Sequence, residues 1–257
     1  MQPKLPSELY EGILCHLTST TDLYNLLFVS RFTAHEAERL LYRAISLHDS
    51  NVVETFAKCI CGSPGADLVR RLEIRTNDQV YDESCLRALR AALRHLKYLK
   101  QFTFDGSLTC NTYDETPTTI FVLEDATTSL ESLVFGSIDS EHIHLLNKQT
   151  QLKELVMENG GALWDTKAFP LVTIAGCPGQ LVEKCLDTSG VSKISRFRLT
   201  HGVPFSHSSP FTHIRSIDVC LFTVDADVFS RIVCKFPSLE YLRCTIKPYG
   251  FMVSGQH

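Results

Sequence analysis

Long apolar runs are missing from this chain of 257 residues, and none approaches the roughly 18–20 consecutive apolar residues that a transmembrane helix requires. Residues 1–8 have no long apolar core behind their single lysine, so we expect no secretory signal. Charge of one sign is not in large excess either, because 25 Lys and Arg stand against 29 Asp and Glu. These absences exclude a strongly basic nucleic-acid binder and predict an intracellular protein, cytoplasmic, nuclear or both.

Sequence motifs of catalysis and of metal binding are also missing. Gly160-Gly161 lacks the further glycine or the Gly-Lys-Ser/Thr ending of a phosphate-binding loop, and no Gly-x-Ser-x-Gly occurs. On a helix, His142 and His144 would point about 200° apart, which suits zinc poorly. The ten cysteines form one close pair, at 59–61, without a second pair at zinc-site spacing. We therefore predict reduced structural thiols, no metal, no cofactor and no catalytic residue.

The first 48 residues have the apolar spacing of three short helices. The first is expected to begin near Ser7, the second to be capped by Asp22, and the third to begin at Ser30 or Thr33 and to run to Ile45. Three short helices bury little apolar surface alone. An exposed apolar face is therefore expected here, covered by a partner or by the rest of the chain.

The motifs of residues 3–47 resemble an F-box. Leu-Pro stands at 5–6, Asp-Leu at 22–23, Val-Ser-Arg at 29–31 and Leu-Tyr-Arg at 41–43, where many F-boxes have Trp in place of the Tyr. The resemblance implies that residues 3–48 form a helical module that binds the adaptor subunit of a cullin-RING ubiquitin ligase. The implied adaptor contacts are Leu5, Pro6, Leu9, Ile13, Leu17, Leu23, Leu26 and Val29. The alternative is an ordinary helical cap on a larger domain.

Residues 49–67 are interpreted as a linking segment. The stretch from Val52 to Ile60 could form a docked helix, and the turn cluster at 61–65 holds two Gly and one Pro.

A short pattern, apolar-x-x-apolar-x-apolar, recurs eight times over the remainder of the chain. Its middle positions are Leu72, Phe102, Leu133, Leu155, Val172, Phe197, Ile217 and Leu242, with steps of 30, 31, 22, 17, 25, 20 and 25 residues. Most steps are near the roughly 20–29 residues of a leucine-rich repeat. Apolar positions of helical spacing lie between the strands, for example at Leu86, Leu89 and Leu93.

Residues 68–257 thus resemble an irregular leucine-rich-repeat solenoid, with parallel strands on the concave side and helices and loops outside. The predicted fold class is α/β, and the alternative is an irregular α/β domain that shares the pattern by composition. Strand residues that alternate with the anchors would line the concave side, where solenoids bind partners. The predicted substrate-binding residues are Arg71, Arg75, Glu154, Glu158, Arg196, Arg198, Tyr241 and Arg243.

Charge is segregated along the repeats. Residues 68–100 carry a net +4, residues 101–147 a net −8 without any Lys or Arg, and residues 188–217 a net +4. A basic stripe formed by Arg87, Arg90, Arg94 and Lys97 is interpreted as the solvated face of a repeat helix rather than a nucleic-acid surface.

Together the two resemblances imply the substrate-recognition subunit of a cullin-RING ubiquitin ligase. Its partners would be the adaptor and an unknown protein substrate, with no membrane and no nucleic acid. It would catalyse no bond chemistry, and would act by holding a substrate near the charged conjugating enzyme. Two alternatives stay open: a repeat scaffold unconnected with ubiquitin, and an enzyme with an unrecognised Cys–His or carboxylate site.

Overall fold

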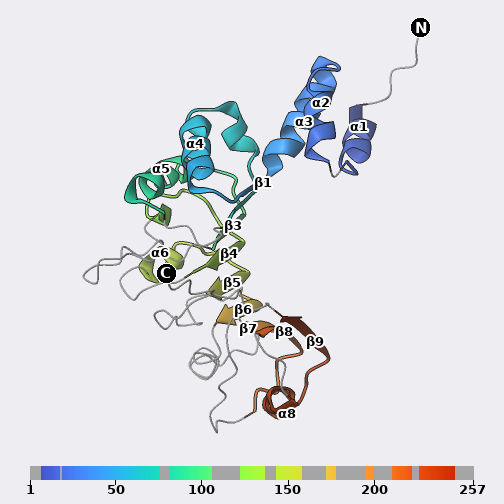
Figure 1. Cartoon of the computed structure of the whole chain (residues 1–257), viewed down its shortest axis with the longest axis vertical. Coiled ribbons are helices and arrows are strands. Elements are labelled where there is room, and N and C mark those ends of the chain that lie inside the picture. The colour runs from blue at the N-terminus through green and yellow to red at the C-terminus, as the bar shows by residue number, and fades with distance from the viewer. Residues whose placement is uncertain are drawn as a thin grey trace, which may run out of the picture. The chain divides into compact units, whose positions relative to one another are not determined.

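Figure 1 shows a computed structural model of the chain. The structure describes residues 7–17, 19–75, 81–105, 122–136, 143–157, 172–177, 195–199, 210–221 and 226–246. The chain divides into two compact units. The first comprises Met1–Pro117 with Phe121–Leu130, and the second comprises Glu131–His257 with Thr118–Ile120. The boundaries predicted from the sequence, at residues 48 and 67, separate a helical module, a linking segment and a solenoid. This division differs from that of the two compact units, and the predicted boundaries stay predictions.

The described residues of the first unit form helices and three parallel strands. In chain order they are α1 (Ser7–Leu14), α2 (Thr20–Leu26), α3 (Arg31–Arg43), β1 (Ala44–Leu47), α4 (Ser50–Ile60), the 3₁₀ helix η1 (Pro64–Leu68), β2 (Arg71–Arg75), α5 (Glu83–Leu93) and β3 (Gln101–Asp105).

Serine side chains cap two of the first three helices. The Ser19 hydroxyl accepts a hydrogen bond from the Asp22 amide at 3.2 Å, so Ser19 is the N-cap of α2, and the prediction of Asp22 was wrong. The Ser30 hydroxyl accepts from the Thr33 amide at 3.1 Å, which confirms Ser30 over Thr33 as the start of α3. A capping oxygen satisfies an amide that the first helical turn leaves without a partner.

The third helix is shorter than predicted, because it ends at Arg43 and not at Ile45. Strand β1 begins at the next residue, and Ile45 pairs with Leu72 of β2. Leu72 in turn pairs with Phe102 of β3, and both are fully buried. The parallel sheet therefore begins one strand earlier than the sequence pattern indicated.

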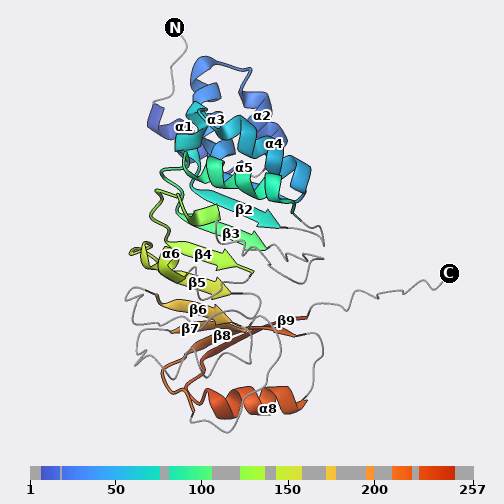
Figure 2. The same ribbon diagram turned by 90° about the vertical axis from the view of Figure 1, so that its left-hand side faces the viewer.

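Helices α4 and α5 lie side by side, as Figures 1 and 2 both show. The predicted linking helix is confirmed as α4, whose N-cap Asp49 accepts from the amides of Asn51 and Val52. On α5 the leucines at 86, 89 and 93 are all buried, as their spacing predicted.

The described residues of the second unit form six strands that pair in chain order, all parallel (Figure 2). Its elements are β4 (Ser132–Phe135), α6 (Ile143–Asn147), β5 (Glu154–Met157), β6 (Ile174–Cys177), β7 (Arg196–Leu199), β8 (Ser216–Leu221), α8 (Ala226–Lys235) and β9 (Tyr241–Ile246). The inward row through Leu133, Leu155, Phe197 and Ile217 is fully buried. The described residues thus confirm the predicted α/β class and the parallel strands.

The anchors predicted for β6 were wrong. Leu155 pairs with Ala175 and not with Val172, while Ile174 pairs with Glu154 and faces the other side of the sheet. Ala175 and Cys177 are the buried anchors, and both are too small to compete with Val and Ile as an apolar signal in the sequence. With Ala175 as middle position, the steps from Leu155 to Phe197 become 20 and 22 residues, which is more regular than the predicted 17 and 25.

Candidate protein-interaction surfaces

Exposed apolar side chains are concentrated on the first three helices and in the turn between α2 and α3. Ten large apolar side chains are exposed among the described residues, and six of them lie between residues 9 and 32. On α1, Leu9 is 52% exposed and Ile13, one turn later, is 55% exposed. Since single exposed apolar residues are normal on a protein surface, it is this concentration that indicates an interaction surface.

The predicted adaptor contacts fall into three groups. Leu9, Ile13 and Val29 are exposed, and Leu17 and Leu26 are half-buried. Leu23 is buried in the core of the first unit. The remaining two, Leu5 and Pro6, lie outside the described residues.

Sequence reasoning missed three exposed aromatic side chains: Tyr24 on α2, Phe28 in the turn after it, and Phe32 on α3. The Tyr24 and Phe28 rings meet edge to face at 5.4 Å, and the Phe32 ring lies 4.8 Å from that of Tyr10 on α1. The four-residue step from Tyr24 to Phe28 was a visible signal. The predicted apolar face consists of aliphatic residues and does not include these aromatic rings.

In the first unit, the predicted substrate-binding residues Arg71 and Arg75 lie exposed on β2, on the face opposite to the buried anchors. Glu73 stands between them and pairs with both, at 3.7 Å from Arg71 and in closer contact with Arg75. The three charges largely satisfy one another. Exposed pairs of this kind contribute little to stability.

In the second unit, Glu154 and Arg196 contact neighbouring strands. Glu154 accepts a hydrogen bond from the Ser132 hydroxyl at 2.7 Å. Arg196 donates from Nε to Oδ2 of Asp218 at 3.1 Å, and Asp218 is buried. Arg196 therefore compensates a buried carboxylate, which makes it a structural residue as much as a binding candidate.

Three other predicted binding residues of this unit form no hydrogen bond or ion pair with any described side chain: Arg198, Tyr241 and Arg243. Across the sheet, Arg198 of β7 pairs with Gly176 of β6 on one side and with Asp218 of β8 on the other. Asp218 in turn pairs with Arg243 of β9. A Cβ at Gly176 would lie 2.9 Å from Cγ1 of Val156 and 3.0 Å from Cβ of Arg198, so only glycine fits there. Glu158, the eighth predicted residue, lies outside the described residues.

The three arginines of the predicted basic stripe, on α5 and at its C-cap, pair with acidic side chains. Arg87 pairs with Glu83 at 2.6 Å, and Arg90 and Arg94 both pair with Asp125. Hydrogen bonds from Arg94 and Arg90 hold the pKa of the Asp125 carboxyl below its usual value. Asp125, from the acidic segment 101–147, thus pairs with two of the bases of the preceding segment.

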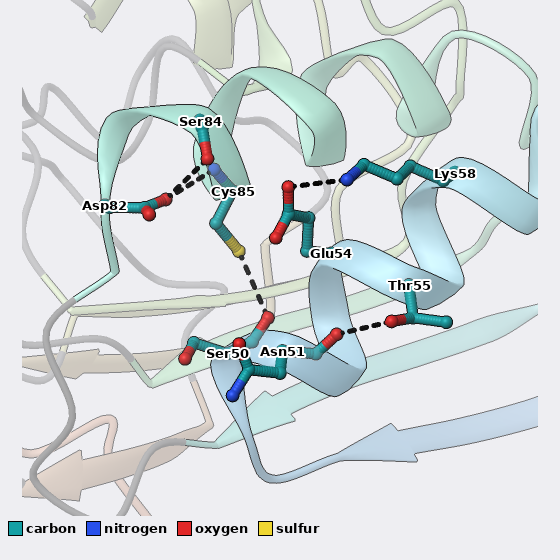
Figure 3. A network of polar contacts seen from close by, with 8 residues as sticks. All are labelled: Ser50, Asn51, Glu54, Thr55, Lys58, Asp82, Ser84 and Cys85. Carbon is teal, nitrogen blue, oxygen red and sulfur yellow. Dashed lines mark hydrogen bonds and ion pairs between the residues drawn. The ribbon is translucent and has the colours of Figure 1, made fainter.

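Cys85 joins α4 to α5 (Figure 3). Its thiol lies 3.6 Å from the Ser50 carbonyl oxygen, and its amide donates to the Asp82 carboxylate at 2.7 Å. Burial, reinforced by the charges of Asp82 and Glu54, raises the pKa of this thiol to about 11. A reactive cysteine needs the opposite shift, so Cys85 has the surroundings of a structural thiol.

The other described cysteines agree with the prediction of reduced thiols, because those at 15, 59, 61, 177, 234 and 244 are free as well. Cys234 and Cys244 are exposed. No group of three or more His, Cys, Asp or Glu that could hold a metal ion occurs among the described residues. None of the helices in that part of the chain combines the length and the apolar character that a membrane crossing requires.

Comparison with known proteins found no family model and no curated protein that matches this chain.

Proposed function

We propose that this protein is the substrate-recognition subunit of a cullin-RING ubiquitin ligase, with α1–α3 as an F-box module and the parallel strands as leucine-rich-repeat units. The observation that carries the proposal is the concentration of exposed apolar side chains on α1–α3, in the segment whose motifs resemble an F-box. A second protein that buries the exposed halves of Leu9 and Ile13 would gain, for each, roughly half of the 1.5–3 kcal/mol that complete burial of such a side chain provides.

The proposed protein performs no bond chemistry itself. The helices bind the adaptor, while the strands hold a protein substrate and so raise the effective concentration of its lysines near the conjugating enzyme. This division of labour predicts that the two binding activities can be lost separately.

Co-purification with the adaptor subunit tests the helical half of the proposal. The intact chain should form a complex with the adaptor that survives size-exclusion chromatography, and the double substitution Leu9→Asp with Ile13→Asp should abolish it. Val52→Asp on α4 is a matched control, because Val52 is 50% exposed in the same unit. A chain that fails to bind the adaptor would leave a repeat scaffold or an unrecognised enzyme as the function.

For the substrate side, the structure favours Arg198 and Arg243 over Arg196, which is engaged by Asp218. In cells, charge reversal at Arg198 and Arg243 should remove cross-linked partners other than the adaptor while the adaptor is retained. Arg231→Glu is the matched control, since Arg231 is an exposed residue of α8 that pairs with Asp227. Partners unchanged by the double reversal would rule out this face.

A further inference from the structure

A basic hollow of about 620 Å³ lies in the first unit, where the three strands β1, β2 and β3 begin. It is lined by five cationic side chains, those of Arg39, Arg43, Arg70, Arg71 and Lys100, together with Ala44, Leu68 and Gln101. Its volume is within the range of roughly 300–1,000 Å³ that is usual for ligand pockets.

Strand register brings these charges together. Ala44, Arg71 and Gln101 pair in one row at the start of the three strands. The residue before each strand is basic in all three cases: position 43 and position 70 are arginines, and position 100 is a lysine. Because parallel strands begin at the same edge of a sheet, three cations that are 27 and 30 residues apart in the chain become neighbours.

The backbone holds this edge in place. The Arg70 amide donates to the Arg43 carbonyl at 3.0 Å, and the Lys100 amide donates to the Arg70 carbonyl at 2.8 Å. The Arg70 guanidinium donates to the Asp67 carbonyl at 2.6 Å and lies over the Tyr98 ring, 4.9 Å from its centre. A ligand would therefore find at least one guanidinium already oriented.

Acidic side chains are absent from the eight residues that line the hollow. From outside the hollow, Glu36 pairs with Arg39 at 3.0 Å, and Glu73 lies 3.7 Å from Arg71. No described side chain pairs with the guanidinium of Arg43. The contrast is with Arg90 and Arg94, which both pair with Asp125. A concave surface lined by one sign of charge concentrates counter-ions of the other sign.

We infer that this hollow binds a phosphate-bearing anion. A phosphoryl group carries close to two negative charges and three acceptor oxygens, so it can satisfy several cations at once, whereas a carboxylate carries one charge and two oxygens. Arginine forks match phosphate oxygens in pairs, and four of the five cations are arginines. The phosphoryl group could belong to a free small molecule or to a phosphorylated side chain of a protein. The inference does not depend on the proposed function. Of the residues that line the hollow, Arg71 alone is also a predicted substrate-binding residue, and none is a predicted adaptor contact.

Calorimetric titration of the full chain tests the inference with three probes: inorganic tripolyphosphate, a phosphoserine peptide and the same peptide without phosphate. Saturable binding of tripolyphosphate alone identifies a free phosphate compound as the source. Binding of the phosphopeptide, but not of its unphosphorylated form, identifies a protein source. The absence of saturable binding by both phosphate probes overturns the site.

Charge reversal locates the binding. Arg43→Glu and Lys100→Glu, both at exposed side chains, should each weaken the phosphate probe at least about tenfold. The matched control is Lys97→Glu, an exposed lysine of the same unit that does not line the hollow, and it should leave the affinity within about twofold. If a reversed variant does not fold by circular dichroism, Lys100→Gln replaces it, with a loss of several-fold expected. The inference is contradicted if Lys97→Glu weakens phosphate binding as much as the lining variants do, or if the lining variants do not weaken it.

Discussion

Two amphipathic helices of the first unit, α1 and α5, resemble each other in pattern and differ in what covers them. On α5 the leucines at 86, 89 and 93 are at most 1% exposed. On α1, Leu9 and Ile13 keep about half of their surface exposed. Helix α5 packs beside α4, and α1 packs against α3. Helical periodicity therefore predicts that a helix has an apolar face. Whether that face is buried within the chain depends on which other elements pack against the helix.

The largest difference in stability between the two helices is expected when a leucine is truncated on the covered helix, α5. Leu89→Ala should lower the free energy of unfolding by about 2–5 kcal/mol, because it leaves a cavity among buried neighbours. Leu9→Ala should change it by no more than about 0.5 kcal/mol, because half of that side chain is already in water. Urea unfolding of both variants measures the difference. Equal losses would mean that α1 is as well covered as α5.

A smaller effect is expected where α3 is attached to the rest of the unit. Gly65 of η1 is buried, and a Cβ there would lie 2.9 Å from Cε1 of Tyr42 on α3. Gly65→Val should therefore cost about 1–3 kcal/mol of unfolding free energy through overpacking. Tyr42→Leu combined with Gly65→Val should recover part of the loss. A Gly65→Val variant as stable as the native chain would show that α3 does not depend on this contact.

The smallest expected effect concerns the N-cap of α5. The Asp82 carboxylate accepts from the amide and hydroxyl hydrogens at Cys85 and Ser84, and these bonds hold the pKa of Asp82 below its usual value. Asp82→Ala should cost about 1 kcal/mol at neutral pH. Since the folded pKa is lowered, the stabilisation is present above the unfolded pKa of about 3.9 and is lost as the pH falls through the folded value.

Thermal unfolding at pH 7 and near pH 3 checks this prediction. The gap between the native chain and Asp82→Ala should narrow at the lower pH, and Asp82→Asn, which keeps an acceptor oxygen, should retain part of the stability. A gap that is independent of pH would mean that the carboxylate charge does not contribute.

Much of the fold was predictable from local pattern. The large anchors Leu72, Phe102, Leu133 and Phe197 were found because large apolar residues at strand spacing are unambiguous. Strand β1 was missed although Tyr42-x-x-Ile45-x-Leu47 has the same pattern, because this stretch had been assigned to a helix. The shift at β6 could not be predicted, because Ala175 and Cys177 carry too little apolar signal.

The candidate sites were predictable only in part. Exposure of Leu9 and burial of Leu23 depend on which elements pack together, and both residues look alike in the sequence. The pairing of Arg196 with Asp218 joins residues 22 apart in the chain and depends on strand register. The basic hollow depends on the register of three strand starts, so segment charge alone could not indicate it.

The affinity of the full chain for the ligase adaptor tests the central claim most directly, namely that α1–α3 leave an apolar surface to a second protein. Surface plasmon resonance with the native chain, Leu9→Asp/Ile13→Asp and the control Val52→Asp gives three dissociation constants. We predict a tight complex for the native chain and the control, and an affinity at least about a hundredfold weaker for the double variant. No binding by the native chain, or equal binding by all three, would contradict the account.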